Sequence, residues 1–446
     1  MKVFPRNLKL LMQIGLVFLA MLACGLPNGV PEETPTVPPP PFPTATVTAR
    51  PTERPGPSPA PSATPEPETV ECPGVERAIA LLVDPLLAEG IDPGLRQFRV
   101  DLCRDGYMAL ETRSAFSNPD QVRAHLAGLY AETEGQLAGA ILIGDLPHAY
   151  QWVTLTSANP DIPSTGEEAI SFQYYADLDG VFGRSPAYVS PGGHAYSYDL
   201  HTGNADWEIW IGVLPLHRGE YALSIEALNA YFMKNHAYRI GDYVIPRAFL
   251  QINEHFSAST MSEHNQILTA MRSGTYAWTP FSTEPTAMLF FDSPPGGLSV
   301  ADGYANLPAG SADFTVGDAH GYWGGHGTLD VAWVESNSIR TVFFWSNGCS
   351  VGNLDFADNF LTSVVYSPTS LVLVAKGTTN NSGGMGTNSQ GFFGHNIATA
   401  MAGGSSFGDA ILSHVNVPLI HPWADSREFH FATVVIVGDP TLVLQP

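Results

Sequence analysis

One short apolar segment in the first half of the chain restricts the fold more than any other feature. Residues 137–144 read Leu-Ala-Gly-Ala-Ile-Leu-Ile-Gly, and the segment is closed by Asp145, Leu146 and Pro147. A run of this length without a polar position indicates a strand buried on both faces, which is typical of parallel sheets. Such a sheet needs helices on both faces, so the expected fold class is α/β with mainly parallel sheets.

The hydrophobic spacing of the rest of the chain agrees with this class. Residues 155–205 are rich in Gly, Ser, Pro, Tyr and Asp, which indicates long loops. We predict two units, 71–240 and 241–446, that form a two-subdomain α/β sandwich. Helices are predicted over 75–87, 120–134, 221–238, 262–272 and 394–402. Strands are predicted over 97–102, 137–144, 208–214, 247–252, 287–291, 313–323, 341–346, 370–375 and 432–437.

The segment before residue 71 is not expected to join this fold. Residues 25–70 hold 15 of the 37 prolines, mixed with Thr, Ser, Ala and Glu, and cannot bury apolar surface. We therefore predict a disordered stalk. Residues 1–24 combine a basic start with an apolar run from Leu10 to Ala23, which is shorter than the ~20 residues of a membrane-spanning helix. This pattern is typical of a secretory signal peptide.

The end of that signal resembles the cleavage box of bacterial lipoproteins. Ala23 precedes Cys24, which would receive the lipid, although Met21 stands where the box usually has Leu. The resemblance implies an extracytoplasmic protein that is either anchored by lipid at a bacterial cell surface or secreted. An ordinary signal peptide with an incidental cysteine is the alternative.

The charge of the chain excludes two classes of partner. Lys and Arg number 20 against 43 Asp and Glu, for a formal charge of −23. Such a surface repels phosphate backbones and anionic headgroups, so neither nucleic-acid binding nor electrostatic membrane binding is expected. Membrane contact is therefore expected through the N-terminal lipid only.

The four cysteines are too few for a disulfide scaffold, and no CxxC pair indicates a zinc site. Export would place Cys72 and Cys103 in an oxidising compartment, where a disulfide would join the end of the stalk to an early strand. Two separate buried thiols are the alternative. Cys349 is the remaining candidate for chemistry.

Two predicted strand ends carry residues suited to nucleophilic catalysis. His326-Gly327 follows one strand, and Cys349 ends the next strand 23 residues later. The carboxyl ends of parallel strands meet at one edge of a sheet, so an imidazole and a thiol would share that edge. The imidazole would help the thiolate to form, and the N–H groups of Gly327 and Cys349 would bind an oxyanion. A small core cysteine and an unrelated loop histidine are the alternative.

Several segments resemble the gingipain-type branch of the caspase-fold cysteine peptidases, in the order of that family. They cover about residues 95–446. They are 140–147 (AILIGDLP), 174–180 (YYADLDG), 209–215 (IWIGVLP), 325–328 (GHGT) with Trp333, 343–352 (FFWSNGCSVG) and 437–442 (VGDPTL). The resemblance implies a caspase-like fold with the chemistry in the second subdomain, His326 as base and acid, and Cys349 as nucleophile. It also implies hydrolysis of peptide bonds in proteins or peptides through a thioester, with no cofactor for the chemistry.

The chain departs from the family at particular positions. Val213 replaces the Arg of the third segment, and Asn353-Leu354 replace a Phe after the cysteine. The resemblance places a third catalytic acid in the loop after the strand at 247–252, where Glu254 comes first and Glu263 second. His320-Gly321 is a rival for the His-Gly pair.

Related enzymes bind calcium, and Asp177 and Asp179 alternate in a loop with Gly180 as calcium ligands do. A solvated turn is the alternative reading. For the base of a substrate pocket, Asp409 and Asp425 are candidates by position only. The rival to an enzyme is a caspase-like surface module that binds without catalysis.

Overall fold

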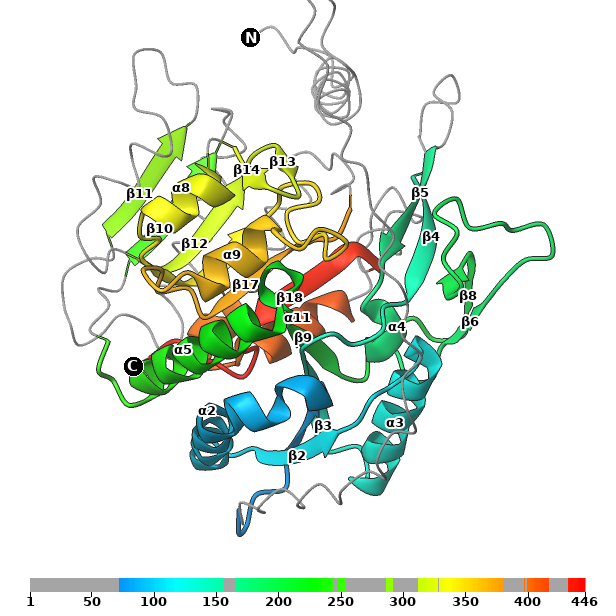
Figure 1. Ribbon diagram of the computed structural model, residues 1–446, viewed down its shortest axis with the longest axis horizontal. Helices are drawn as coiled ribbons and strands as arrows, with labels where there is room; N and C mark the ends of the chain where they lie inside the picture. The colour runs from blue at the N-terminus through cyan, green and yellow to red at the C-terminus, as the bar shows by residue number, and fades with distance from the viewer. Residues whose placement is uncertain are drawn as a thin grey trace, which may run out of the picture.

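The protein is described here by a computed structural model, shown in Figure 1, which describes residues 72–155, 165–243, 248–253, 286–291, 312–327, 329–380, 397, 399–416 and 432–445. The predicted signal peptide at 1–24, with Cys24, and the predicted stalk at 25–70 lie outside these residues. None of the helices in the described ranges is long and apolar enough to cross a membrane.

A ten-stranded sheet forms the centre of the molecule. The strands of the predicted first unit and those of the second join in this one sheet, where β18 meets β9 through Val437 and Val213. The ladders of this sheet are parallel except the one between β17 and β18, which is antiparallel. In sheet order the strands are β11 (Thr286–Phe291), β10 (Ala248–Asn253), β12 (Ala312–Asp318), β16 (Thr341–Ser346), β17 (Val374–Thr378), β18 (Val434–Gly438), β9 (Trp210–Leu214), β3 (Leu137–Ile143), β1 (Ala78–Val83) and β2 (Met108–Arg113).

Helices cover both faces of this sheet, as the α/β class requires (Figure 1). On β16, Phe344 packs toward Phe360 of α9, and the next residue, Trp345, packs toward Phe407 of α11. Consecutive strand residues point to opposite faces, so α9 and α11 lie on opposite sides of the sheet. The helices are α2 (Pro85–Arg104), α3 (Pro119–Glu132), α4 (Gln173–Ala176), α5 (Tyr221–Arg239), α8 (Val331–Ser336), α9 (Phe360–Tyr366) and α11 (Phe407–Val415), with the 3-10 turn η1 (His217–Gly219).

Three small sheets form in the segments that connect the elements of the central sheet. Two of them lie in the segment predicted as loops, 155–205, or begin just before it. The first contains β4 (Tyr150–Leu155), β5 (Thr165–Ile170) and β7 (Ser197–Tyr198), the second β6 (Val181–Gly183) and β8 (Leu200–Thr202), and the third β13 (Gly321–Tyr322), β14 (Gly325–His326) and β15 (Leu329–Asp330).

The prediction for residues 75–102 was wrong in both parts. The segment expected as a helix forms the buried strand β1, and the strand expected at 97–102 lies inside α2. The side chain of Asp84 caps α2 by accepting from the Leu86 N–H, and Pro85 opens the helix. A Cβ on Gly90 would lie 2.6 Å from Ile225 Cδ1 of α5, so the glycine permits close packing of the two helices.

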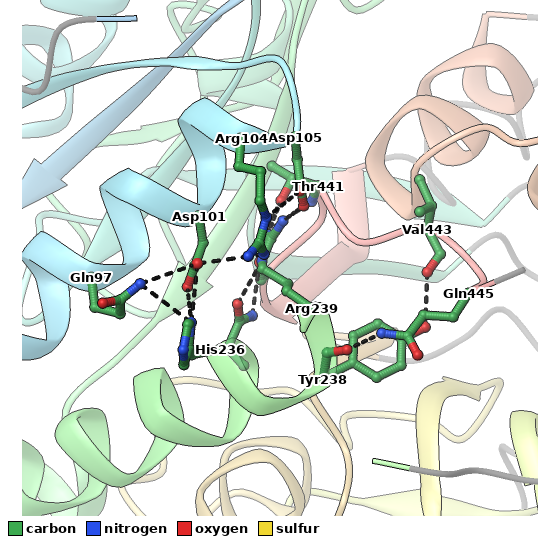
Figure 2. A network of polar contacts seen from close by, with 12 residues as sticks. Gln97, Asp101, Arg104, Asp105, His236, Tyr238, Arg239, Thr441, Val443 and Gln445 are labelled. Carbon is green, nitrogen blue, oxygen red and sulfur yellow. Dashed lines mark hydrogen bonds and ion pairs between the residues drawn. The ribbon is translucent and has the colours of Figure 1, made fainter. Parts of the chain in front are cut away.

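A buried polar network ties the C-terminal segment to α5 and α2 (Figure 2). Asp439, fully buried after β18, accepts from Asn235 Nδ2 at 2.8 Å and forms an ion pair with the buried Arg239. Arg239 also donates to Thr441 Oγ1 at 2.6 Å and pairs with Asp105. The segment 437–442, one of those that resemble the gingipain-type peptidases, therefore has a structural role. It lies at the opposite end of the strands from Cys349.

Candidate active site

The proposed nucleophile lies at the carboxyl end of β16, next to the carboxyl end of β12. The two strands are parallel neighbours, with Gly317 opposite Ser346. Past the strand, the Asn347 N–H donates to the Gly317 carbonyl at 2.8 Å, which holds the first residue of the following turn. Cys349 follows in that turn, half-buried and outside any disulfide.

The hairpin β13–β14 brings His326 back to this turn. Gly321 pairs with His326 across the hairpin, and a Cβ on Gly321 would lie 2.7 Å from both the N and the O of Cys349. A Cβ on Gly348 would lie 2.6 Å from His326 Cδ2. Two glycines thus permit the imidazole and the cysteine backbone to approach, so the structure brings His326 and Cys349 together.

The imidazole of His326 is completely buried. It packs against the rings of Phe344 and Phe360, with centroids 6.2 and 6.1 Å away. Among the described residues neither ring nitrogen has a hydrogen-bond partner, so no imidazole–thiol hydrogen bond forms in this conformation. Burial lowers the pKa of His326 to about 4, and the ring is therefore neutral near pH 7.

The predicted oxyanion donor Gly327 is engaged in this conformation. Its φ of +58° is readily adopted by glycine, and its N–H donates to the carbonyl of His320 at 2.7 Å. His320 itself is exposed and lies two residues after the end of β12. The rival histidine therefore lies near the same strand ends, but at the surface.

The other predicted acids divide into two groups. Glu254, Glu263 and Asp425 lie outside the described residues. Asp409 forms an ion pair with Arg77, and the preceding residue, Gly408, donates its N–H to the carbonyl of Pro440. Pro440 follows Gly438, which pairs with the first residue of β17, so this end of the sheet is opposite to the carboxyl ends of β16 and β17. Asp409 therefore lies far from Cys349 and cannot form the base of a pocket there.

Asp177 and Asp179 lie in an acidic cluster that includes one residue the sequence did not indicate. Oxygen atoms of Asp177, Asp179 and Glu208 all lie within 4.8 Å of one another. Burial, with Asp179 and Asp177 nearby, raises the pKa of Glu208. Asp177 is fully buried and contacts His201 Nε2 at 2.7 Å. Three carboxylates that converge in this way suit a hard cation such as Ca²⁺.

Cys72 and Cys103 are joined by a disulfide, with Cα atoms 5.6 Å apart. Cys103 lies in α2, so the bond ties the residues before β1 to a helix and not to an early strand as expected.

The fold matches those of solved peptidases. The chain is similar to the Arg-specific cysteine proteinase gingipain R, with a TM-score of 0.56, 14% identity and coverage of 85% of this chain and 80% of that one. It is also similar to the Porphyromonas gingivalis RgpB pro- and mature-domain complex (TM-score 0.54, 15% identity, 83% and 80% coverage). A structure described only as a protease gives a TM-score of 0.55 at 10% identity, with 83% and 79% coverage.

No family model and no curated protein sequence matches the chain. The structural likeness nevertheless defines the class of fold. The chain has the α/β fold of the gingipain-type cysteine proteinases, as its sequence motifs predicted.

Proposed function

We propose that the protein is a cysteine peptidase in which Cys349 is the nucleophile and His326 is the base and acid. The observation that supports this most strongly is the contact of the His326 ring with Gly348, one residue before a half-buried cysteine at a strand end. This juxtaposition, on the fold of cysteine proteinases, has the parts that thiol catalysis needs.

The proposed reaction has two halves. The Cys349 thiol gives its proton to the imidazole as Sγ attacks the peptide carbonyl carbon, and the carbonyl electrons form an oxyanion bound by backbone N–H groups. Collapse breaks the C–N bond, and the imidazole gives its proton to the leaving amine. A water that loses a proton to the imidazole then attacks the thioester, which releases the carboxylic acid and restores the thiol.

Two local changes would complete the site when substrate binds. The imidazole of His326 would need to turn toward Sγ, and the Gly327 N–H would need to exchange the His320 carbonyl for the oxyanion. In apo enzymes catalytic hydrogen bonds are often long and tighten only with substrate.

A second arrangement uses His320 as the base. Its exposure and its place near the carboxyl end of β12 favour it, whereas the burial of His326 favours a supporting role for that ring. The acyl chemistry and the nucleophile would be unchanged.

The test is hydrolysis of a mixed fluorogenic peptide library by the full chain and three variants. Cys349→Ala should abolish cleavage, and His326→Ala should lower kcat by about 10²–10⁴-fold, with His320→Ala near the parent value. The reverse result for the two histidines would move the base to His320. No cleavage by the parent, with intact folding, would favour the binding module.

We further propose that the enzyme acts outside the cytoplasm, anchored through lipid on Cys24. The support is the signal-like segment, the lipoprotein-like box and the proline-rich stalk. Incorporation of an alkyne fatty acid into the parent but not into Cys24→Ser would support it, and equal incorporation would contradict it.

A further inference from the structure

A buried lysine lies beside the proposed active site without a carboxylate partner. Lys376 on β17 is 5% exposed and pairs in register with Trp345 of β16. Its Nζ lies 4.5 Å from the centroid of the Trp345 ring and donates to the Ser346 carbonyl at 3.3 Å. No carboxylate of the described residues forms an ion pair with it. Burial lowers the pKa of Lys376 to about 7, and its Nζ, which makes one long hydrogen bond, keeps further hydrogen-bonding capacity.

The other lysine of the folded part shows what a purely structural arrangement looks like. Lys234 on α5 is also buried, at 8% exposure. Its Nζ donates to the carbonyls of Val365 and Ser370, at 2.8 and 3.1 Å, where α9 ends. Lys234 thus satisfies free carbonyls at a helix C-terminus, which Lys376 does not.

Asn347 adds a second unsatisfied donor on the same side of the sheet. Its Oδ1 accepts from Trp345 Nε1 at 2.7 Å, and its Nδ2 has no hydrogen-bond partner among the described residues. Because an indole N–H only donates, this contact fixes the amide orientation and leaves the NH₂ group turned away from the indole. Asn347 is 4% exposed, so the NH₂ group is a fixed, buried donor.

The arrangement about Cys349 is two-sided. His326 contacts Phe344 and Phe360, on the α9 face of β16. Trp345, with Lys376 over its ring, packs against Phe407 on the α11 face. Cys349 comes two residues after Asn347, at the edge between these faces. A peptide held there would meet the imidazole from one face and the donors from the other.

We propose that Lys376 and Asn347 bind the side-chain carboxylate of the substrate residue before the scissile bond, and that the enzyme cleaves after acidic residues. A carboxylate accepts several hydrogen bonds and would satisfy both the ammonium and the amide NH₂. An Arg side chain, the specificity given in the description of gingipain R, would instead bring a further cationic donor group to the Lys376 amine and the Asn347 NH₂ group. This inference rests on the proposed function for the place of cleavage, but carboxylate binding can be tested without catalysis.

The binding experiment uses the full chain carrying Cys349→Ala, so that no peptide is consumed. Matched peptides that end in Asp or in Asn amide, with the C-terminus amidated in both, are titrated by calorimetry. We expect the Asp peptide to bind about 10- to 100-fold more tightly than the Asn peptide. Lys376→Met should remove this difference, and Lys234→Met, the matched buried lysine, should retain it.

Asn347→Leu provides a second variant in case Lys376→Met fails to fold, and it should reduce the same ratio by a smaller factor. Equal affinity of both peptides for the parent site, or an unchanged ratio in folded Lys376→Met, would overturn the proposal. The cleavage experiment then separates the two hypotheses. Asp-selective binding without turnover by the Cys349 protein would reject the peptidase and retain the carboxylate site. Turnover with preference for Arg or neutral residues would retain the peptidase and reject the site.

Discussion

The polar network of Figure 2 and the edge of the sheet around Cys349 treat buried polar groups in opposite ways. In the network, Arg239 has Asp439 and Thr441 as partners, and Asp439 also accepts from Asn235. Near Cys349, His326 and the Asn347 NH₂ group have no hydrogen-bond partner within the part of the chain that the structure describes. Buried polar groups are nearly always satisfied in native proteins. A ligand bound at this edge would satisfy both groups, whereas the network holds the fold.

The largest expected effect separates activity from stability at His326. His326→Phe should lower kcat by about 10²–10⁴-fold because the acid and base are lost. The same change should leave the free energy of unfolding unchanged or raise it by about 1–3 kcal/mol, since an unsatisfied buried imidazole is replaced by an apolar ring. Urea unfolding and a peptide assay on the same sample measure both. If the free energy of unfolding fell by as much as the activation free energy rose, His326 would be a structural residue.

Asp439→Ala should have the opposite signature in the network. Loss of the carboxylate leaves Arg239 buried without its fully buried partner and should lower the free energy of unfolding by about 3–5 kcal/mol. Asp105→Ala, which removes a partly exposed partner of the same arginine, should lower it by about 0–1 kcal/mol. Urea titration of both variants checks this. If both variants lowered the free energy of unfolding by the same amount, the buried carboxylate would contribute no more to stability than the partly exposed one.

The burial of His326 should also make the free energy of unfolding depend on pH. The pKa of His326 falls from 6.5 to about 4 on folding, so between these values the unfolded chain binds a proton that the folded chain does not. The free energy of unfolding should therefore fall as pH falls from about 6.5 to about 4, by roughly 3 kcal/mol for this residue.

The pKa of His414 is also lowered to about 4, by burial and by Lys376. His326→Phe should therefore remove part of the slope and leave the rest. An identical slope in parent and variant, measured by urea unfolding across this pH range, would contradict the burial of His326.

The acidic cluster is a third case, in which like charges lie close together. Ca²⁺ bound by Asp177, Asp179 and Glu208 should stabilise the fold by about 3 kcal/mol at a hundredfold excess over Kd. Chelation should reverse the gain, and Glu208→Gln should reduce it while leaving the melting temperature without calcium unchanged or higher. The melting temperatures of the parent and of Glu208→Gln, measured with and without Ca²⁺, test this expectation. A response that survives in Glu208→Gln would place calcium elsewhere.

Sequence reasoning gave the strands of the central sheet because burial on both faces leaves a continuous apolar run, as at 137–144 and 341–346. It failed over 75–102 because packing overrides propensity there. Gly90, Pro93 and Gly94 oppose a helix locally, yet α2 tolerates them because the glycines permit α5 to approach. The capping pair Asp84-Pro85 was the available signal for the true start of α2.

The candidate site was predictable where motif and strand end coincide, as for His326 and Cys349. Glu208 was not, because it lies far along the sequence from Asp177 and meets it only through the fold. Lys376 and Asn347 carry no motif, and their incomplete hydrogen bonding is visible only in three dimensions. The glycine next to His326 predicted an oxyanion donor. The sequence did not indicate that the Gly327 N–H would donate to the His320 carbonyl instead.

Covalent labelling of Cys349 in the full chain tests whether this thiol is an activated nucleophile. A mixture of peptidyl acyloxymethyl ketones, with Asp, Asn, Ala and Arg before the electrophile, is followed by intact and peptide mass spectrometry, beside iodoacetamide as a generic reagent. Our account predicts one adduct, on Cys349, that forms far faster than alkylation by iodoacetamide and is lost in His326→Phe. Slow alkylation of Cys349 by iodoacetamide, without any peptidyl adduct on folded protein, would show an unactivated thiol and contradict the account.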